Sequence, residues 1–203
     1  MVTALKITAV LIVSYILGSV SVAVLVSKYI FKSDVRDSGS KNAGTTNMAR
    51  VYGMSAGIIT LAGDILKTVI SMLLGKLLLG EMGLALGGVG CIAGHCWPVF
   101  FGFKGGKGVA VSAGIAIMLG WEYVVSLIGL FFVIAVLTKY VSLGSLIAVA
   151  MSVPALIIFN DYGVWIYVLC IFLTVCVWYM HRGNIKRLLT GTKSKFVPGK
   201  RKK

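Results

Sequence analysis

Charged residues are scarce in this 203-residue sequence, and acidic residues are scarcer still. Only 13% of the residues are charged and only 6 are Asp or Glu, whereas 58% are hydrophobic. A soluble domain of this size is usually about one quarter charged. Most of the protein surface must therefore face lipid instead of water. The acidic residues are scattered along the chain, so they cannot form an aspartate-rich metal site of the kind that CDP-alcohol phosphotransferases need.

Cysteine is present, but in no arrangement that is typical of a disulfide or a metal site. None of the four cysteines belongs to a C-x-x-C pair, and three lie in or near apolar runs, where cysteine behaves as a small hydrophobic residue. We interpret all four as packing residues and predict no disulfide, no metal site and no cofactor. They are Cys91, Cys96, Cys170 and Cys176.

Basic residues dominate the charge, and 20 Lys and Arg give a formal net charge of +14. In a soluble protein this excess would indicate nucleic-acid binding. Here the basic residues form short clusters between apolar runs, which is the positive-inside pattern of membrane loops. We therefore expect a lipid bilayer, and no nucleic acid, as a partner. The basic run at 200–203 also suits contact with anionic headgroups.

Seven apolar segments indicate an all-α integral membrane protein with about seven transmembrane helices, some of them short. Lipid cannot satisfy backbone polar groups, and these runs show no strand-like alternation, so helices are expected. A single domain covers 1–203, with a basic cytoplasmic tail at 182–203. The apolar segments are 7–27, 55–79, 83–103, 109–120, 123–138, 141–159 and 162–180.

Charge placement favours seven crossings over one long bent helix at 109–138. The segment at 109–120 is only about 18 Å of helix, which is short for a ~30 Å hydrocarbon core. With seven crossings and the N-terminus outside, the basic turns and the basic tail all lie inside. Merging the fourth and fifth segments would place that tail outside. No A-x-A cleavage site follows the first segment, so we expect it to remain as a permanent span.

Three polar, glycine-rich segments interrupt the apolar pattern, at 38–50, 94–108 and 181–191. The expected topology places all three on the cytoplasmic side. Together they bring many cations, two histidines and few acids to one face of the membrane. This combination favours an anionic, phosphate-bearing ligand at the membrane surface.

The second of these segments contains Lys104-Gly105-Gly106-Lys107-Gly108 directly before an apolar segment. Glycine lets backbone N–H groups curl around an anion, and a helix N-terminus adds partial positive charge. The two lysines add full charges. The G-x-x-x-x-G-K-[ST] spacing of a P-loop is absent. Taken alone, this segment fits a flexible positive-inside turn equally well.

The first segment offers hydroxyl and amide groups next to a guanidinium that suits phosphate oxygens. Its polar residues are Ser40, Asn42, Thr45, Thr46, Asn47 and Arg50. A polar loop with an Asn or Thr helix cap is the alternative interpretation.

The third segment follows the last apolar run. His181 and Asn184 are three residues apart, so they share one face of a continuing helix, and Arg182, Lys186 and Arg187 extend the charge. An interfacial belt of basic side chains is the alternative here.

Asp64 and Lys67 lie inside the second apolar segment. Charges are costly within a membrane, so we expect these two side chains to pair. The sequence leaves open whether the pair is structural or faces a substrate.

The three polar segments resemble, in order and spacing, those of the acyl-phosphate:glycerol-3-phosphate acyltransferases, the PlsY-type family. The first resembles the loop S-G-N-x-G-A-T-N followed by an arginine. The second is very close to G-H-x-x-P-x-F-x-x-F-K-G-G-K-G-V-A-T, and the third resembles H-R-x-N-I-x-R-L-x-x-G. The resemblance extends from the first apolar segment to about Lys195.

This resemblance implies a seven-helix fold with its motifs on the cytoplasmic side of the bacterial inner membrane. It implies transfer of a fatty acyl group from acyl phosphate, not from acyl-CoA or acyl carrier protein, to the 1-position hydroxyl of glycerol 3-phosphate. The products would be lysophosphatidic acid and inorganic phosphate, in the first acylation step of phospholipid biosynthesis. The enzyme that supplies acyl phosphate is a further candidate partner.

Four positions depart from the family pattern. Lys41 replaces the usual glycine and Thr45 the usual alanine, while Val111 and Lys193 stand where threonine and glutamate are common. These departures bear on rate and regulation more than on the class of reaction.

The resemblance and the chemistry of the side chains together define a predicted site. Because two phosphates repel each other, cations are needed to bind them side by side, while hydroxyl and amide groups are able to orient oxygens or stabilise an oxyanion. The predicted catalytic residues are Ser40, Asn42, His181 and Asn184. The predicted substrate-binding and phosphate-binding residues are Arg50, Lys104, Lys107, Gly105, Gly106, Thr46, Asn47 and His95.

The proton acceptor for the attacking hydroxyl is not a carboxylate, because the three motifs contain none that fits. His95 and His181 are the two histidines, and either is able to act as a base. Our hypothesis is that the phosphate of the donor takes the proton while His181 and Asn184 position it. No Ser-His-Asp set is legible, so no covalent acyl-enzyme is expected.

Glycerophosphate acyltransferases of the H-x-x-x-x-D type are excluded, because neither histidine is followed by aspartate at that spacing. A small anion or phosphate transporter is the alternative function, and the intramembrane Asp64 and Lys67 are the feature that favours it.

Overall fold

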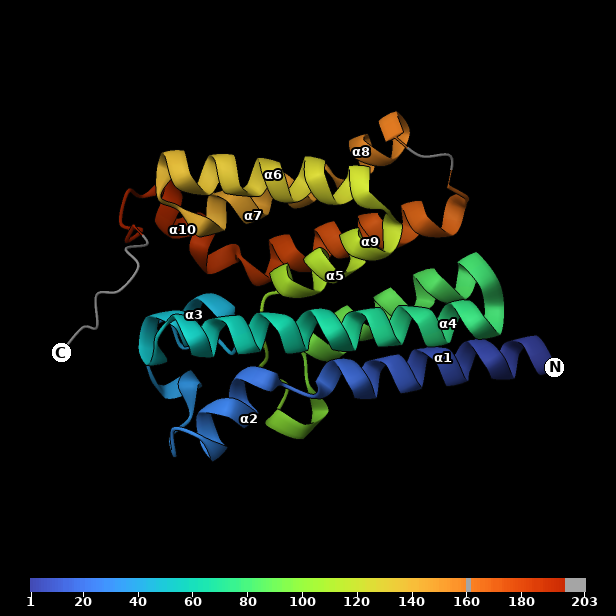
Figure 1. The fold of residues 1–203 in the computed structure, drawn as a ribbon, viewed down its shortest axis with the longest axis horizontal. Helices are drawn as coiled ribbons and strands as arrows, with labels where there is room; N and C mark the ends of the chain where they lie inside the picture. The colour runs from blue at the N-terminus through green and yellow to red at the C-terminus, as the bar shows by residue number, and fades with distance from the viewer. Residues whose placement is uncertain (160–161, 196–203) are drawn as a thin grey trace.

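The computed structural model describes residues 1–159 and 162–195, and within these ranges it contains helices and turns but no strand. The long helices run roughly along one direction and form a bundle (Figure 1). The all-α fold expected from the sequence is confirmed. The α-helices are α1 (Val2–Ser19), α2 (Val22–Tyr29), α3 (Thr45–Tyr52), α4 (Met54–Cys96), α5 (Val109–Leu119), α6 (Trp121–Thr138), α7 (Val141–Ala150), α8 (Ser152–Phe159), α9 (Val164–Met180) and α10 (Arg182–Leu189), and two short 3-10 helices are η1 (Val35–Asp37) and η2 (Val99–Phe101).

The apolar run predicted as one continuous helix at 7–27 is broken. Val20 has an extended backbone (φ −69°, ψ 102°), so α1 ends before it and α2 begins after Ser21. The carbonyls of Gly18 and Val20 receive hydrogen bonds from Lys67 Nζ of α4, both at 2.9 Å. Carbonyls at a helix end lack partners within the helix, and a donor from elsewhere satisfies them. The break thus depends on a side chain that is distant in sequence.

Helix α4 consists of two antiparallel arms that meet at Gly80, whose φ of 59° lies in the left-handed region that glycine tolerates. The backbone of Gly83 lies so close to Gly75 that neither position has room for a side chain, and Gly87 is equally close to the Ser71 carbonyl. The pairings 75/83 and 71/87 fit only arms that run in opposite directions. The segments predicted at 55–79 and 83–103 therefore correspond to these two arms.

Two further breaks shape the C-terminal half. Gly120 has φ 126° and ψ 164°, so α5 and α6 are separate helices and a single helix over 109–138 is ruled out. Helices α7 and α8 meet at Met151 with a bend of 46°. Pro154 has no N–H and cannot donate to the carbonyl of Ala150, four residues earlier, which accounts for that bend. The segment predicted at 141–159 is thus one apolar run made of two helices.

Three helical runs in the described residues are long and apolar enough to cross a membrane, namely Val2–Tyr29, Met54–Phe101 and Trp121–Thr138. Counting the bent pairs α7–α8 and α9–α10 as spans gives up to five. The chain is therefore a membrane protein by length and composition of its helices. Seven crossings remain a prediction, as does the side of the membrane on which each end lies. The N-terminus and α10 lie at opposite ends of the bundle (Figure 1).

The main hydrophobic core lies where α4, α5, α6 and α9 meet. Ile92, Ile115, Tyr123 and Leu169 are among its fully buried side chains. The four cysteines are buried and free, and all four belong to this cluster, so their interpretation as packing residues is confirmed. The basic run at 200–203 lies outside the described residues.

Candidate active site

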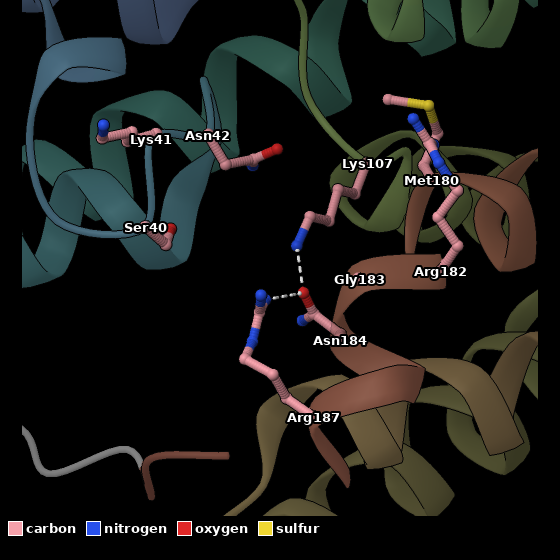
Figure 2. A pocket seen from close by; sticks show the side chains of 9 residues that line it. All are labelled: Ser40, Lys41, Asn42, Lys107, Met180, Arg182, Gly183, Asn184 and Arg187. Atoms are coloured by element: carbon pink, nitrogen blue, oxygen red, sulfur yellow. Dashed lines mark hydrogen bonds between the residues drawn. The ribbon is translucent and has the colours of Figure 1, made fainter. Parts of the chain in front are cut away.

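A cleft of about 330 Å³ brings residues of all three polar segments together (Figure 2). Four of its nine lining residues are cations and none is acidic. The lining residues are Ser40, Lys41, Asn42, Lys107, Met180, Arg182, Gly183, Asn184 and Arg187. The convergence of 38–50, 94–108 and 181–191 that the sequence suggested is therefore present in the fold.

Asn184 is the centre of the cleft's hydrogen bonding. Lys107 Nζ donates to Asn184 Oδ1 at 2.7 Å, and an Arg187 N–H donates to the same oxygen at 2.9 Å (Figure 2). Two cationic donors on Oδ1 fix the orientation of the amide and leave its NH₂ group as the free donor of that side chain. The side chain of Asn184 is held in place because α9 ends at Met180 and α10 begins at once, with a bend of 60° between them.

Lys107 is a half-buried cation among other cations. Burial lowers the pKa of its ammonium group to about 8, and the nearby charges of Lys193, Arg187 and Arg50 lower it in the same direction. Bringing several like charges together is unfavourable in the empty cleft. A bound anion would relieve that repulsion, so the arrangement is suited to phosphate.

The first segment is shaped by Asn47, which is buried at the start of α3. Its Nδ2 donates to the carbonyls of Val35 and Ser38 at 3.1 and 3.0 Å, and its Oδ1 accepts from the backbone N–H of Ser40 at 2.8 Å. The amide of Asn47 is thus committed to the loop and does not line the cleft. Its role in the structure is to present Ser40, and with it Asn42, to the cleft.

His95 also lies outside the cleft, at the end of α4. Its Nδ1 is 3.1 Å from Lys67 Nζ and 3.5 Å from Asp64 Oδ1, and Lys67 Nζ is 2.8 Å from the same carboxylate oxygen. The expected pairing of Asp64 with Lys67 is present. Because Lys67 also donates to two backbone carbonyls at the break between α1 and α2, the pair has a structural role.

His181 is buried directly behind the cleft but is not among the residues that line it. Its Nδ1 is 2.8 Å from the carbonyl of Val177, so the proton sits on Nδ1 and Nε2 is the unprotonated nitrogen. Burial, reinforced by the charge of Lys107, lowers the pKa of His181 to about 4. The imidazole is therefore neutral near pH 7 and is a weak base.

The remaining predicted residues do not line the cleft. Thr46 and Arg50 lie on α3, and Arg50 is close enough to affect the pKa of Lys107. Lys104 is exposed. Gly105 and Gly106 lie against the end of α4, where a side chain at either position would overlap His95.

Several functional candidates were absent from the predicted set. Lys41, Met180, Arg182, Gly183 and Arg187 all line the cleft. The basic residues belonged to segments that the sequence had already singled out, whereas nothing in the sequence distinguishes Met180 or Gly183.

Arg36 is a further residue that the sequence did not single out. Its guanidinium donates to the carbonyl of Phe101 at 2.7 Å, which ties η1 to the turn after α4. It also donates to Asp34 at 2.8 Å and thereby lowers the pKa of that carboxyl to about 2. Arg36 thus links η1, which directly precedes the first polar segment, to the second polar segment.

Among the described residues, no group of three or more His, Cys, Asp or Glu side chains is arranged to hold a metal ion.

Comparison with known proteins gives a consistent result. Residues 8–191 match the family model described as glycerol-3-phosphate acyltransferase. A glycerol-3-phosphate acyltransferase of Thermoanaerobacter pseudethanolicus is 40% identical over 91% of this chain and 92% of its own length. Glycerol-3-phosphate acyltransferase 2 of Bacillus anthracis is 41% identical over 92% of this chain and 97% of its own length.

Two solved structures share the fold. The glycerol 3-phosphate form of PlsY (YgiH), an integral membrane glycerol 3-phosphate acyltransferase, matches with a TM-score of 0.88 and 33% identity, over 94% of this chain and 96% of that one. The lysophosphatidic acid form of PlsY matches with a TM-score of 0.86 and 32% identity, over 94% and 95% of the two chains.

Proposed function

The chain belongs to the glycerol-3-phosphate acyltransferase family, and from that premise we propose that it transfers a fatty acyl group from acyl phosphate to the 1-position hydroxyl of glycerol 3-phosphate. Acyltransferase activity follows from the family. The donor, the position acylated and the product, lysophosphatidic acid, are the proposed part. The observation that carries the proposal is the cleft with four cations and no acid among its lining residues.

The charge of the cleft matches the charge of the two substrates. Acyl phosphate and glycerol 3-phosphate each carry a phosphate group, and two such anions a few ångströms apart repel strongly. Lys41, Lys107, Arg182 and Arg187 bring four cationic residues to the walls of the cleft that would receive these anions. An acyl-CoA donor would not bring a phosphate to the reacting carbonyl in this way, so the cleft favours acyl phosphate.

The reaction needs positioning more than activation, because phosphate is a good leaving group. The substrate hydroxyl attacks the acyl carbonyl, a C–O ester bond forms, the carbonyl-to-phosphate C–O bond breaks, and inorganic phosphate leaves. Holding both reactants in contact is worth several kcal/mol, on the order of 7–11 for well-oriented groups. Ser40, Asn42 and the NH₂ group of Asn184 are the uncharged donors in the cleft, and we assign to them the orientation of the carbonyl and its developing oxyanion.

We propose that the proton of the attacking hydroxyl passes to the donor phosphate, which then leaves as inorganic phosphate. A general base works best with a pKa near the working pH, and the pKa of about 4 for His181 is far below it. His181 also presents no atom to the cleft lining. We assign to it the support of Asn184, because His181 is the N-cap of α10 and its carbonyl accepts the backbone N–H of Asn184 at 2.7 Å.

His181→Gln separates these two roles. If the donor phosphate accepts the proton, we expect kcat to stay within about threefold of wild type, since only the support of Asn184 is disturbed. Loss of turnover by about a thousandfold with unchanged substrate binding would instead identify His181 as the base. Single-turnover rates with saturating acyl phosphate are the measurement.

The donor is tested by assaying purified protein with labelled glycerol 3-phosphate and either palmitoyl phosphate or palmitoyl-CoA. We expect labelled lysophosphatidic acid from the acyl phosphate only. Product from palmitoyl-CoA alone would contradict the proposed donor while leaving the family assignment intact. Proteoliposomes without donor provide the control for the transporter alternative, since the enzyme should carry no phosphate flux.

We also propose that the cleft faces the cytoplasm, as the positive-inside pattern of its segments indicates. Thr190 near the cleft and Glu81 in the turn between the two arms of α4 are both exposed. A membrane-impermeant maleimide should label Thr190→Cys in inverted vesicles, where the cytoplasmic side faces outward. It should label Glu81→Cys in right-side-out vesicles. Labelling of Thr190→Cys from the outside would reverse the proposed orientation.

A further inference from the structure

Three buried side chains of α4 lie in mutual contact and form one group, the Asp64–Lys67–His95 triad. Asp64, Lys67 and His95 are only 1%, 7% and 6% exposed. Ionised side chains at such depth in a membrane protein are expensive, so each must be compensated by a partner. The pairing of Asp64 with Lys67, and the two carbonyls that Lys67 caps, account for two members of the triad. They do not account for His95.

The place of His95 follows from the hydrogen bonds around Lys67. A charged lysine only donates, so His95 Nδ1, at 3.1 Å, accepts from Lys67 and the imidazole proton is on Nε2. The ring is thereby fixed from the bundle side, with its Nε2 edge turned toward Gly106. A side chain on Gly106 would overlap that edge.

The backbone repeats this connection. The N–H of Gly106 donates to the carbonyl of His95 at 3.0 Å, and Gly105 lies against the same carbonyl. The next residue is Lys107, whose ammonium group reaches Asn184 in the cleft. The residue whose backbone bonds to His95 is therefore the immediate neighbour of the cation that would bind phosphate.

We infer that the Asp64–Lys67–His95 triad is a positioning element of the active site, which sets the place of Lys107 through the contact between His95 and Gly106. This inference rests on the proposed function, because it assigns Lys107 to the binding of a phosphorylated substrate. The triad touches no substrate. It ties the break between α1 and α2, both arms of α4 and the turn before α5 to one fixed point.

The inference is tested by a double-mutant cycle on the contact itself. Gly106→Ala places a methyl group against the imidazole and should displace Lys107, raising KM for glycerol 3-phosphate about tenfold with a smaller change in kcat. His95→Ala should raise KM by a similar factor, because the turn loses its support. In the His95→Ala/Gly106→Ala variant the imidazole no longer meets the methyl group, and the carbonyl of Ala43 is the contact that remains, so KM should be close to that of His95→Ala alone. A merely structural role would give independent effects that multiply to about a hundredfold, and that result would overturn the inference.

Two further variants guard against trivial outcomes. Asp64→Asn keeps the volume of the side chain while weakening the hold on Lys67, and should raise KM severalfold in protein that is purified and folded normally. Thr60→Val is the matched control, one turn before Asp64 on α4. It removes a buried hydroxyl that donates to the carbonyl of Ala56 in the same helix. It should leave KM unchanged. Equal KM values for Asp64→Asn and wild type would count against the triad.

Direct binding keeps this test separate from the test of the proposed function. Isothermal titration of each variant with glycerol 3-phosphate should reproduce the order of the KM values. If wild-type protein neither binds glycerol 3-phosphate nor forms product, the proposed function fails. If wild type binds and reacts normally but the two single substitutions act independently in the titration, the positioning role fails and the function stands.

Discussion

Two clusters of charged side chains in this protein differ in whether their cations have an acidic partner. The cleft gathers Lys41, Lys107, Arg182 and Arg187 without an acidic residue among its lining side chains. The buried triad instead contains an acid, a base and an imidazole in mutual contact. Buried charges are tolerated only with partners, whereas accessible cations that have no acidic partner are available to an anionic ligand. The comparison teaches that uncompensated charge, more than charge itself, distinguishes the binding region from the scaffold.

The sharpest test of this contrast is the removal of the central cation of the cleft. Lys107→Ala should lower kcat/KM for glycerol 3-phosphate by about a hundredfold or more, because both a phosphate contact and a support of Asn184 are lost. The melting temperature of the purified protein should change little, since no acid loses its partner. Unchanged kinetics would remove Lys107, and with it the cleft, from the proposed site.

The converse substitution belongs to the triad. Lys67→Met should lower the free energy of unfolding by about 3–5 kcal/mol, because it leaves the buried Asp64 without a cation and two carbonyls without a donor. Combining it with Asp64→Leu should recover part of this loss. Thermal unfolding in detergent is the measurement. If Lys67→Met is as stable as wild type, the charge of Lys67 does not stabilise the fold and the contrast between the two clusters fails.

The charge of Lys107 in the cleft should change with pH in the range where activity is measured. The pKa of this ammonium group is about 8, below its ordinary value, so it is charged below pH 8 and loses its charge as the pH rises. We expect kcat/KM for glycerol 3-phosphate to fall about tenfold per pH unit above 8. Lys107→Arg should move this decline to much higher pH, because a guanidinium remains protonated. A decline at the same pH in both proteins would assign it to another group.

The smallest expected effect is at Lys41, on the edge of the cleft. Its side chain is directed away from Asn184 (Figure 2), and its φ of 56° is in the region that glycine prefers. Lys41→Gly should raise KM for glycerol 3-phosphate only about threefold, by removing one outlying charge. Stability should stay the same or rise slightly, because the strain of a left-handed lysine, about 1 kcal/mol, is relieved. A large loss of stability would contradict this assignment.

The sequence allowed the helical segments to be predicted better than their interruptions. The predicted segments all correspond to helices, since long apolar runs are the strongest local signal for a membrane helix. The break at Val20 was missed because it depends on Lys67 reaching across from α4. The bend at Met151 has a local cause in Pro154, and the sequence offered that signal.

The residues predicted for the site also fall into two groups, those that line the cleft and those that do not. Ser40, Asn42, Lys107 and Asn184 line one cleft, as the convergence of the three segments predicted. Asn47 and His95 carry the same kinds of polar group, yet the fold directs them into the loop and the triad. Which polar side chain faces a ligand and which one satisfies the backbone is decided by tertiary contacts, so residue type and spacing alone did not separate them.

The length of α5 has a consequence for the route of the acyl chain. Its 11 residues, Val109–Leu119, span about 16 Å, roughly half the thickness of a ~30 Å hydrocarbon core. The proposed orientation puts Trp121 at the opposite interface, and Lys107, two residues before this helix, would then lie well below the level of the headgroups. A donor would then present its phosphate to the cations while its hydrocarbon tail stays among the lipids. The acyl chain of the product would then already lie in the bilayer when the ester bond forms, so it would not have to pass through water.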